Sequence, residues 1–285
     1  MILSIHRKTG ESLRRITDVL GFARSSFYQQ SRETPTQVED RHMAKVISEI
    51  FHAHRARYGY RRVQAELLDC GIRCDPGRVR RLMKQEGLRA VQPRRFRPRT
   101  SDGKASAPSP NLLAGKNAIP GKPDKVWTGD ITYIPSASGW LYLAVVVDLY
   151  SRKIVGWSLA KTMKTELVCR ALKQALQTRR PETGLIFHSD RGSQYGSRRF
   201  RRLLKAAGIR QSMSARANPY DNAWTESFIG TLKLENAPAC NYTDDRQART
   251  HLFEYIEGYY NTRRKHSALD YRTPAQYERV TLSLT

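Results

Sequence analysis

The chain has 285 residues, a hydrophobic content of 39% and a formal net charge of +24, with a pI near 10.3. Four cysteines in a chain of this length argue against a disulfide scaffold, and the most apolar run, residues 141–147, is far too short to span a bilayer. The charge predicts a polyanionic partner, either as the substrate of an enzyme or as the ligand of a basic binding protein. The length allows two domains, and the cysteine use predicts the cytosol.

Residues 1–35 predict a short segment that resembles a helix–turn–helix. Two short helices are expected around Gly21, because the apolar residues from Leu13 to Leu20 have helical spacing. Two interpretations of Arg24–Gln30 stay open: a recognition helix, or one arm of a hairpin that packs on a neighbour.

Residues 36–92 predict a helix–turn–helix DNA-binding domain. A helix from about Arg41 to His54 is followed by a helical run from Tyr58, a turn at Gly71, and a helix that Asp75 caps and that ends at Gly87. Basic residues follow the exposed side of that last helix, and charges of one sign favour DNA contact over a merely solvated face. The candidate DNA-binding residues are Arg78, Arg81 and Lys84.

A zinc site in this region is disfavoured. One residue separates the two histidines and three separate the two cysteines, which fits the usual zinc-ligand spacings poorly. The four residues are His52, His54, Cys70 and Cys74.

Residues 93–121 predict a basic linker rich in Pro and Ser. Its apolar content is too low for an independent fold. Arg94, Arg95 and Arg97 are expected to bind DNA phosphates.

Residues 122–240 predict an α/β domain. Strands are expected near 126–134, 140–148, 152–159, 184–189 and 209–213, and helices at 165–178, 196–207 and 222–236. The first three strands form an antiparallel meander. Asp130 on the first strand can meet Asp190 at the end of the fourth only if these two strands are neighbours in the sheet.

Three carboxylates in this domain predict a metal site. Asp130 and Asp190 lie on strands, and Glu226 lies one turn inside a helix with 35 residues between it and Asp190. Carboxylate oxygens are the ligands that Mg²⁺ prefers, and two such ions can assist an in-line displacement at a phosphodiester. Asp148 is the rival carboxylate, for which a structural role is favoured.

The helix that carries Glu226 is expected to bury Trp224, Phe228 and Leu232. At about 100° per residue, Glu226 and Lys233 share roughly the opposite face, which favours contact between Lys233 and DNA. His188 is expected to be a packed strand histidine. Asp221 is expected to cap the helix.

Residues 241–285 predict a C-terminal helical extension. Thr243 is the expected cap of a helix that packs on the core. A polar cluster that includes Arg263, Arg264 and Lys265 follows this helix, and its basic residues can satisfy the helix dipole.

Four motifs follow one another in the chain: D-x-T-Y, H-S-D-x-G-x-Q-Y, N-P-x-D-N-A-x-x-E-S-F and Y-N-x-x-R-x-H. Together they resemble the integrase core of insertion-sequence transposases, within the retroviral-integrase-like superfamily. The pattern is most similar to the OrfB-type catalytic subunit, whose triad is D, D, 35 residues, E. The resemblance covers roughly residues 122–277. It implies that the C-terminal polar cluster lies near the DNA, with Arg263, Arg264 and Lys265 as candidate DNA contacts.

The resemblance implies a ribonuclease H-like fold with a mixed five-stranded sheet and flanking helices. It implies that Asp130, Asp190 and Glu226 are catalytic and hold two Mg²⁺ ions, for which Mn²⁺ can substitute. The implied activity is cleavage at the 3′ ends of a bacterial insertion sequence followed by strand transfer. Alternatives are a ribonuclease H-like nuclease and a catalytically silent DNA-binding regulator.

The resemblance also implies partners and a location. The expected partners are double-stranded DNA, as element terminal repeats and as target, and further copies of the chain, at least as a dimer on DNA. A protein from an upstream frame with a helix–turn–helix or zipper is a further candidate partner. The expected location is the bacterial cytoplasm, at the nucleoid.

Overall fold

The computed structural model describes residues 2–23, 34–91, 108–114, 120–137, 139–215, 223–236 and 242–282. The chain divides into two units, Met1–Ala90 and Val91–Thr285. The possible recognition helix at Arg24–Gln30 and the linker arginines Arg94, Arg95 and Arg97 lie outside the described residues.

The described residues before Gly21 form two helices. Helix α1 (Ile2–Thr9) stops where Gly10 adopts a φ of +68°, and α2 (Leu13–Val19) begins after Ser12, whose hydroxyl accepts a hydrogen bond from the Arg15 backbone amide. Helix α2 lies where the apolar residues from Leu13 to Leu20 predicted a helix, whereas α1 was not predicted. The helix predicted after Gly21 lies outside the described residues.

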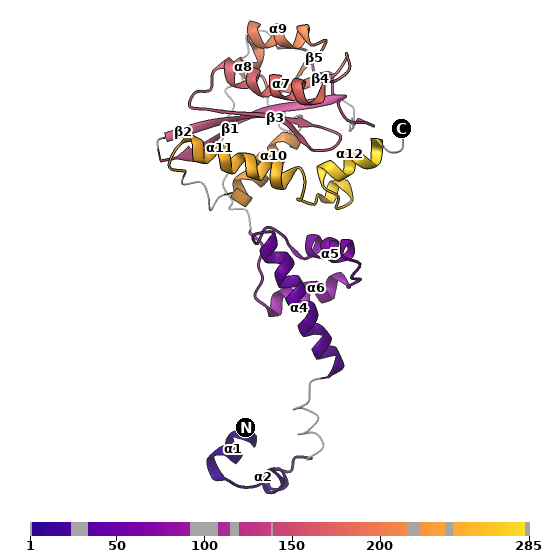
Figure 1. Cartoon of the computed structure of the whole chain (residues 1–285), viewed down its shortest axis with the longest axis vertical. Helices are drawn as coiled ribbons and strands as arrows, with labels where there is room; N and C mark the ends of the chain where they lie inside the picture. The colour runs from indigo at the N-terminus through magenta and orange to yellow at the C-terminus, as the bar shows by residue number, and fades with distance from the viewer. Residues whose placement is uncertain are drawn as a thin grey trace. The chain divides into compact units, whose positions relative to one another are not determined.

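The three helices of the predicted helix–turn–helix region are present (Figure 1): α4 (Pro35–Ala53), α5 (Tyr60–Asp69) and α6 (Pro76–Gln85). Helix α4 begins six residues earlier than predicted, because Thr34 and Gln37 form a reciprocal capping box and proline occupies the first helical position. Asp75 caps α6 as predicted, and its carboxylate accepts from the Gly77 amide at 2.7 Å. The shared core includes the fully buried Ile47, Val63 and Val79.

The second unit contains a five-stranded sheet in the order β3-β2-β1-β4-β5. The strands are β1 (Val126–Ser136), β2 (Gly139–Asp148), β3 (Ile154–Ala160), β4 (Ile186–Ser189) and β5 (Arg210–Met213). Strands β1, β2 and β3 pair antiparallel, whereas β4 is parallel to both β1 and β5. This is the mixed sheet that the sequence predicted.

Helices cover both faces of the sheet (Figure 1). One face carries α7 (Thr165–Arg179), α8 (Ser193–Gly196) and α9 (Arg198–Ala206). Helix α9 is the helix predicted at 196–207, and α8 is a short helix that the sequence did not predict. The break between α8 and α9 is at Ser197, whose hydroxyl caps α9. Helix α7 approaches β3 so closely that a Cβ on Gly156 would lie 2.3 Å from the Ala171 carbonyl oxygen.

The other face carries the C-terminal part of the unit. It consists of α10 (Ala223–Asn236), α11 (Asp245–Phe253), a π-helical turn (Glu254–Tyr260), a short 3₁₀ helix (Ser267–Leu269) and α12 (Pro274–Leu282) (Figure 1). The cap of α11 is Asp244, not the predicted Thr243, and its carboxylate accepts from the Gln247 amide at 2.8 Å. Among the helices of the described residues, none is long and apolar enough to cross a membrane.

Strand β3 is an edge strand, and an unprotected edge would invite pairing with another chain. Polar side chains hydrogen-bond to its backbone: Asn261 to Ile154, Thr178 to Val155, Gln174 to Trp157 and Arg249 to Leu159. Asn261, from the predicted C-terminal polar cluster, makes two of these bonds, at 2.9 and 3.0 Å. It therefore protects the edge of the sheet.

Candidate active site

The strand register brings the two aspartates to adjacent strands. Strands β1 and β4 pair in parallel from Val126 opposite Ile186 to Gly129 opposite Ser189. Asp130 and Asp190 are the next residues on the two strands, so they continue the same register. The sequence analysis required these two strands to be neighbours in the sheet, and the structure confirms that they are.

Backbone amides hold both carboxylates. The Ile131 amide donates to Asp130 Oδ1 at 2.7 Å, and the Gly192 amide donates to Asp190 Oδ1 at 2.9 Å. Burial, and next the charge of Asp190, raise the pKa of the Asp130 carboxyl to about 8. The charge of Asp190 thus disfavours the ionised form of Asp130, because like charges in a partly dry site repel, and a cation bound between the two carboxylates would offset this repulsion.

Helix α10 supplies the third acid. Its buried side presents Phe228 and Leu232, as predicted, while Trp224 is only half-buried. Thr225, immediately before Glu226, is fully buried and donates a hydrogen bond to the hydroxyl of Thr128 on β1 at 2.7 Å. This bond joins the helix to the strand two residues before Asp130.

Glu226 is exposed, and it raises the pKa of Asp130 less than Asp190 does. Within the described residues, no three His, Cys, Asp or Glu side chains lie close enough to hold one metal ion together. That statement covers both the three acids and the zinc candidates His52, His54, Cys70 and Cys74. The structure thus brings Asp130 and Asp190 together, with Glu226 nearby but not gathered into one set of ligands.

Lys233 lies beside the acids, as its position on α10 predicted. Its ammonium sits 3.9 Å from the centre of the Tyr133 ring on β1. Lys233 also lowers the pKa of Asp130, against the larger effects of burial and Asp190. The ammonium is therefore within electrostatic reach of the acidic site.

Gly129 gives the site its tight packing. A Cβ at this position would lie 2.5 Å from the Phe187 ring and 3.3 Å from the hydroxyl of Tyr195, which is buried. The sequence singled out Tyr195 without a role. It gave no sign of the Thr128–Thr225 bond, because 97 residues separate the two threonines.

The rival residues have structural roles. His188 is fully buried, and its ring nitrogens lie 2.8 Å from Ser212 Oγ and 3.2 Å from Ser214 Oγ, which confirms a packed strand histidine. Asp148 is also fully buried, and it accepts hydrogen bonds from the Asp124 amide and from Ser151. The predicted cap Asp221 lies outside the described residues.

The candidate DNA contacts differ in their surroundings. Lys84 and Arg263 are exposed. Arg78 and Arg81 each donate to the Asp40 carboxylate at 2.7 Å. Arg264 is buried and forms an ion pair with Glu235 at 2.8 Å, and Lys265 is also buried. Because both side chains are buried, Arg264 and Lys265 fit a structural role better than the predicted contact with DNA.

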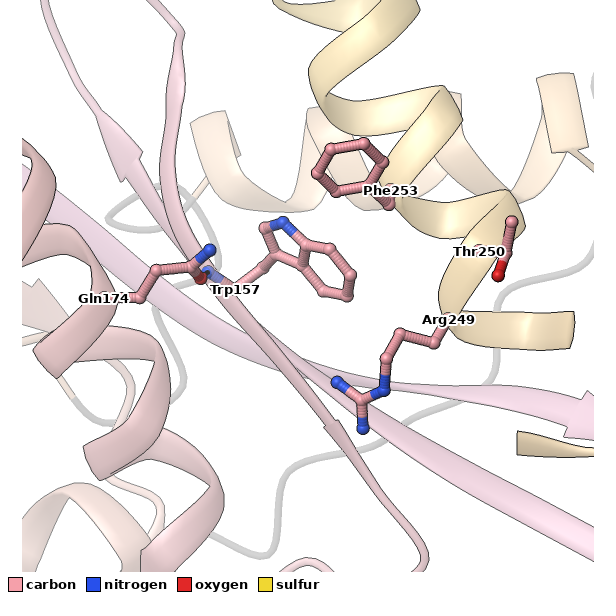
Figure 2. Close-up of a pocket in the computed structure, with 5 residues that line it drawn as sticks. All are labelled: Trp157, Gln174, Arg249, Thr250 and Phe253. Carbon is pink, nitrogen blue, oxygen red and sulfur yellow. Dashed lines mark hydrogen bonds between the residues drawn. The ribbon is translucent and has the colours of Figure 1, made fainter. Parts of the chain in front are cut away.

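A separate cavity of about 470 Å³ lies beside the edge strand β3. Figure 2 shows its lining residues, Trp157, Gln174, Arg249, Thr250 and Phe253. Strand β2 separates β3 from the strand that carries Asp130, so this cavity is not part of the acidic site.

Comparisons with known proteins give the family. Residues 120–219 and 207–274 match integrase core domains, and residues 37–96 match an HTH-like domain. The chain is 43% identical over 250 residues to the transposase for insertion sequence element IS904 of Lactococcus lactis, a match that covers 87% of this chain and 98% of the relative. The chain belongs to the insertion-sequence transposases with an integrase core.

A second relative of this transposase is also named a transposase of an insertion sequence. The chain is 37% identical over 276 residues to transposase InsF of Escherichia coli insertion sequence IS3A, with 95% of this chain and 96% of the relative covered. Among solved structures, the HTLV-2 integrase catalytic core domain in complex with magnesium is similar with a TM-score of 0.42 and 21% identity, over 55% of this chain and 97% of that one. The integrase core matches and the transposase relatives make this chain an enzyme of the DDE transposase and integrase type.

Proposed function

We propose that this transposase cleaves the ends of its insertion sequence and joins them to target DNA, with Asp130, Asp190 and Glu226 as catalytic metal ligands. The adjacency of Asp130 and Asp190 in the β1–β4 register carries the proposal. Their mutual repulsion supports a bound cation, and a site with only carboxylate donors fits a hard divalent ion. Glu226 joins these two acids when metal and DNA are bound.

The proposed reaction has two steps at phosphorus. In the first, water attacks the phosphodiester at an element end, the bond to the 3′ oxygen breaks, and a free 3′-OH is left. In the second, that hydroxyl attacks a target phosphodiester, and the target's own 3′ oxygen leaves. Two Mg²⁺ ions, or Mn²⁺ in their place, would activate the attacking oxygen and stabilise the leaving one.

The protein's own groups position the substrate. Asp130 and Asp190 are fixed by backbone amides, so they need little reorganisation to bind a cation. Lys233 binds a phosphate beside them, and the exposed Arg263 binds a further one. In the first unit, the exposed Lys84 binds DNA phosphates separately. Because two element ends must be joined, we propose at least a dimer on DNA. A protein from an upstream frame would assist recognition of the ends.

The test is a joining assay with the purified full chain. A labelled, precleaved element end is incubated with a target plasmid and Mg²⁺ or Mn²⁺, using wild type, Asp190→Asn and Glu226→Gln. Glu254→Gln, which neutralises an exposed acid outside the site, is the matched control. The proposal expects metal-dependent joined products from wild type and the control, and none from the two site variants.

Other outcomes separate the competing functions. Nicking without joining, unchanged when the upstream-frame protein is added, would make the chain a nuclease. Tight binding without chemistry under every condition would leave a DNA-binding regulator.

A further inference from the structure

An exposed tryptophan lies on the same strand pair as the catalytic aspartate. Trp140 on β2 pairs with Pro135 on β1, and 56% of its surface is exposed. Its ring meets Tyr133 edge to face, with 5.0 Å between ring centres and an angle of 86°. Tyr133 thus holds the orientation of the indole while leaving most of it open to solvent.

Tyr133 also connects Trp140 to the catalytic site. The Lys233 ammonium lies 3.9 Å from the centre of the Tyr133 ring. An ammonium, a tyrosine and an exposed tryptophan therefore lie next to one another beyond the last β1–β4 pair, Gly129 opposite Ser189, and we call them the Trp140 row. Because side chains alternate along a strand, Tyr133 and Trp140 lie on the opposite face of β1 from Asp130, and Lys233, on the helix that packs on the face of Asp130, connects the two faces. Asp130 and Pro135 are five residues apart on β1, so the row is about 17 Å long at ~3.3 Å per residue.

The length and chemistry of the row suit a strand of DNA. About 17 Å corresponds to about five nucleotide steps at ~3.4 Å per step. Proteins that bind unpaired nucleotides combine cations that follow the backbone with aromatic rings on which bases stack, and this stacking tolerates any base sequence. The alternative, an apolar contact with another protein, fits less well, because the row begins at a lysine beside the acidic site and the chain carries +24 charge.

We propose that Trp140, supported by Tyr133, stacks on an unpaired nucleobase of the DNA strand whose scissile phosphate lies at Asp130 and Asp190. Lys233 binds a phosphate of the same strand, between the scissile phosphate and the base that stacks on Trp140. The proposal rests on the proposed function of the acids. It adds a binding site for a base within about five nucleotides of the reacting phosphate.

A stacking probe tests the site without chemistry. The full-length Asp190→Asn protein is titrated into DNA with 2-aminopurine at single positions one to six nucleotides from the scissile phosphate. One series labels the element end, and the other labels the target duplex. One or two positions should change in fluorescence, and the series in which they fall identifies the DNA that supplies the base. Added to this background, Trp140→Ala should remove the change, whereas Trp140→Phe should keep it.

The matched control is Phe253→Ala, because Phe253 is also 56% exposed and lies at the cavity by β3. Trp140→Ala should weaken DNA binding about 5- to 150-fold, the range that loss of one stacked base predicts, while Phe253→Ala should bind as the parent does. An unchanged fluorescence signal and affinity in Trp140→Ala would overturn the proposal. Loss of oligomers in light scattering, with no position of 2-aminopurine responding, would also overturn it and make Trp140 a protein contact.

The two proposals fail in different ways. If no joining occurs but the fluorescence change depends on Trp140, the catalytic proposal fails and the stacking site stands. If joining is normal in a Trp140→Ala protein with an intact triad, and no 2-aminopurine position responds, the stacking site fails and the catalytic proposal stands.

Discussion

The hydroxyl of Thr225 donates a hydrogen bond to the hydroxyl of Thr128 across 2.7 Å, and both side chains are fully buried. Thr128 and Asp130 point to the same face of β1, because side chains alternate along a strand. Thr225 immediately precedes Glu226 on α10. A single bond between two elements therefore fixes where along β1 the third acid stands.

The Thr225→Val variant keeps the shape of the side chain and removes the hydroxyl. It should cost about 1–3 kcal/mol of folding stability, because the Thr128 hydroxyl stays buried without this partner. Joining should fall about 10-fold, and the Mg²⁺ concentration for half-maximal joining should rise, since Glu226 is held less firmly. The Thr225→Ser variant keeps the hydroxyl and should retain most of the activity.

The double variant Thr128→Val, Thr225→Val separates positioning from stability. Replacing both partners by apolar groups of the same shape is nearly neutral for folding, so its melting temperature should return close to that of wild type. The Mg²⁺ requirement should stay raised. If the Mg²⁺ requirement returned to normal together with stability, the pair would have only a structural role.

The Asp130→Asn variant should be more stable than wild type in the absence of metal. Burial and Asp190 raise the pKa of Asp130 to about 8, well above its unfolded value of about 3.9. The folded state therefore binds a proton that the unfolded state has lost, and wild-type stability falls as pH rises from about 4 to about 8. The melting temperature of Asp130→Asn relative to wild type should therefore rise steadily across this window.

Bound metal should make wild type more stable than Asp130→Asn. Mg²⁺ at millimolar concentration should raise the melting temperature of wild type and leave Asp130→Asn unchanged. Asp148→Asn is the control, because Asp148 accepts hydrogen bonds from the Asp124 and Ser151 amides that an amide side chain cannot fully replace. It should lose stability with and without metal. Equal stabilisation of wild type and Asp130→Asn by Mg²⁺ would contradict Asp130 as a ligand.

The parts of this structure that the sequence predicted are those with local or periodic signals. Strand alternation, the Asp75 cap and the apolar side of α10 follow from neighbouring residues. The adjacency of β1 and β4 followed from requiring two acids to meet. The role of Asn261 could not be predicted in this way, because its partner Ile154 is 107 residues away and the residue type fits a DNA contact as well as an edge cap.

Arg264 presents the same difficulty and gives a direct test. Its guanidinium is buried and contacts both carboxylate oxygens of Glu235, whose Oε2 also accepts from the Tyr255 hydroxyl. Removing one partner of a buried pair leaves an uncompensated charge, so Arg264→Ala should lower the free energy of unfolding by about 3–5 kcal/mol. The neighbouring, exposed Arg263→Ala should change it by less than about 0.5 kcal/mol. Chemical denaturation measures both, and a stable Arg264→Ala protein with weakened DNA binding would restore the DNA-contact interpretation.

In the helix–turn–helix region, the Asp40 carboxylate accepts hydrogen bonds from two candidate DNA-binding residues, Arg78 and Arg81. Hydrogen bonds from Arg81, and next from Arg78, lower the pKa of Asp40, so this carboxyl is ionised at neutral pH and offsets their charge. The Asp40→Asn variant should therefore bind DNA more tightly. If both arginines then reach phosphates, the slope of log Kobs against log[salt] should steepen by about 1.8.

Glu86→Gln is the matched control for Asp40→Asn. It makes the same change in net charge at an exposed position directly after α6. An effect that comes only from net charge would be equal in the two variants, whereas release of Arg78 and Arg81 is specific to Asp40→Asn. Lys84→Ala should make the slope shallower by about 1, because Lys84 is exposed on the same helix. Fluorescence anisotropy over a salt series measures all three slopes, and unchanged affinity in Asp40→Asn would mean that these arginines serve only the packing of α6 on α4.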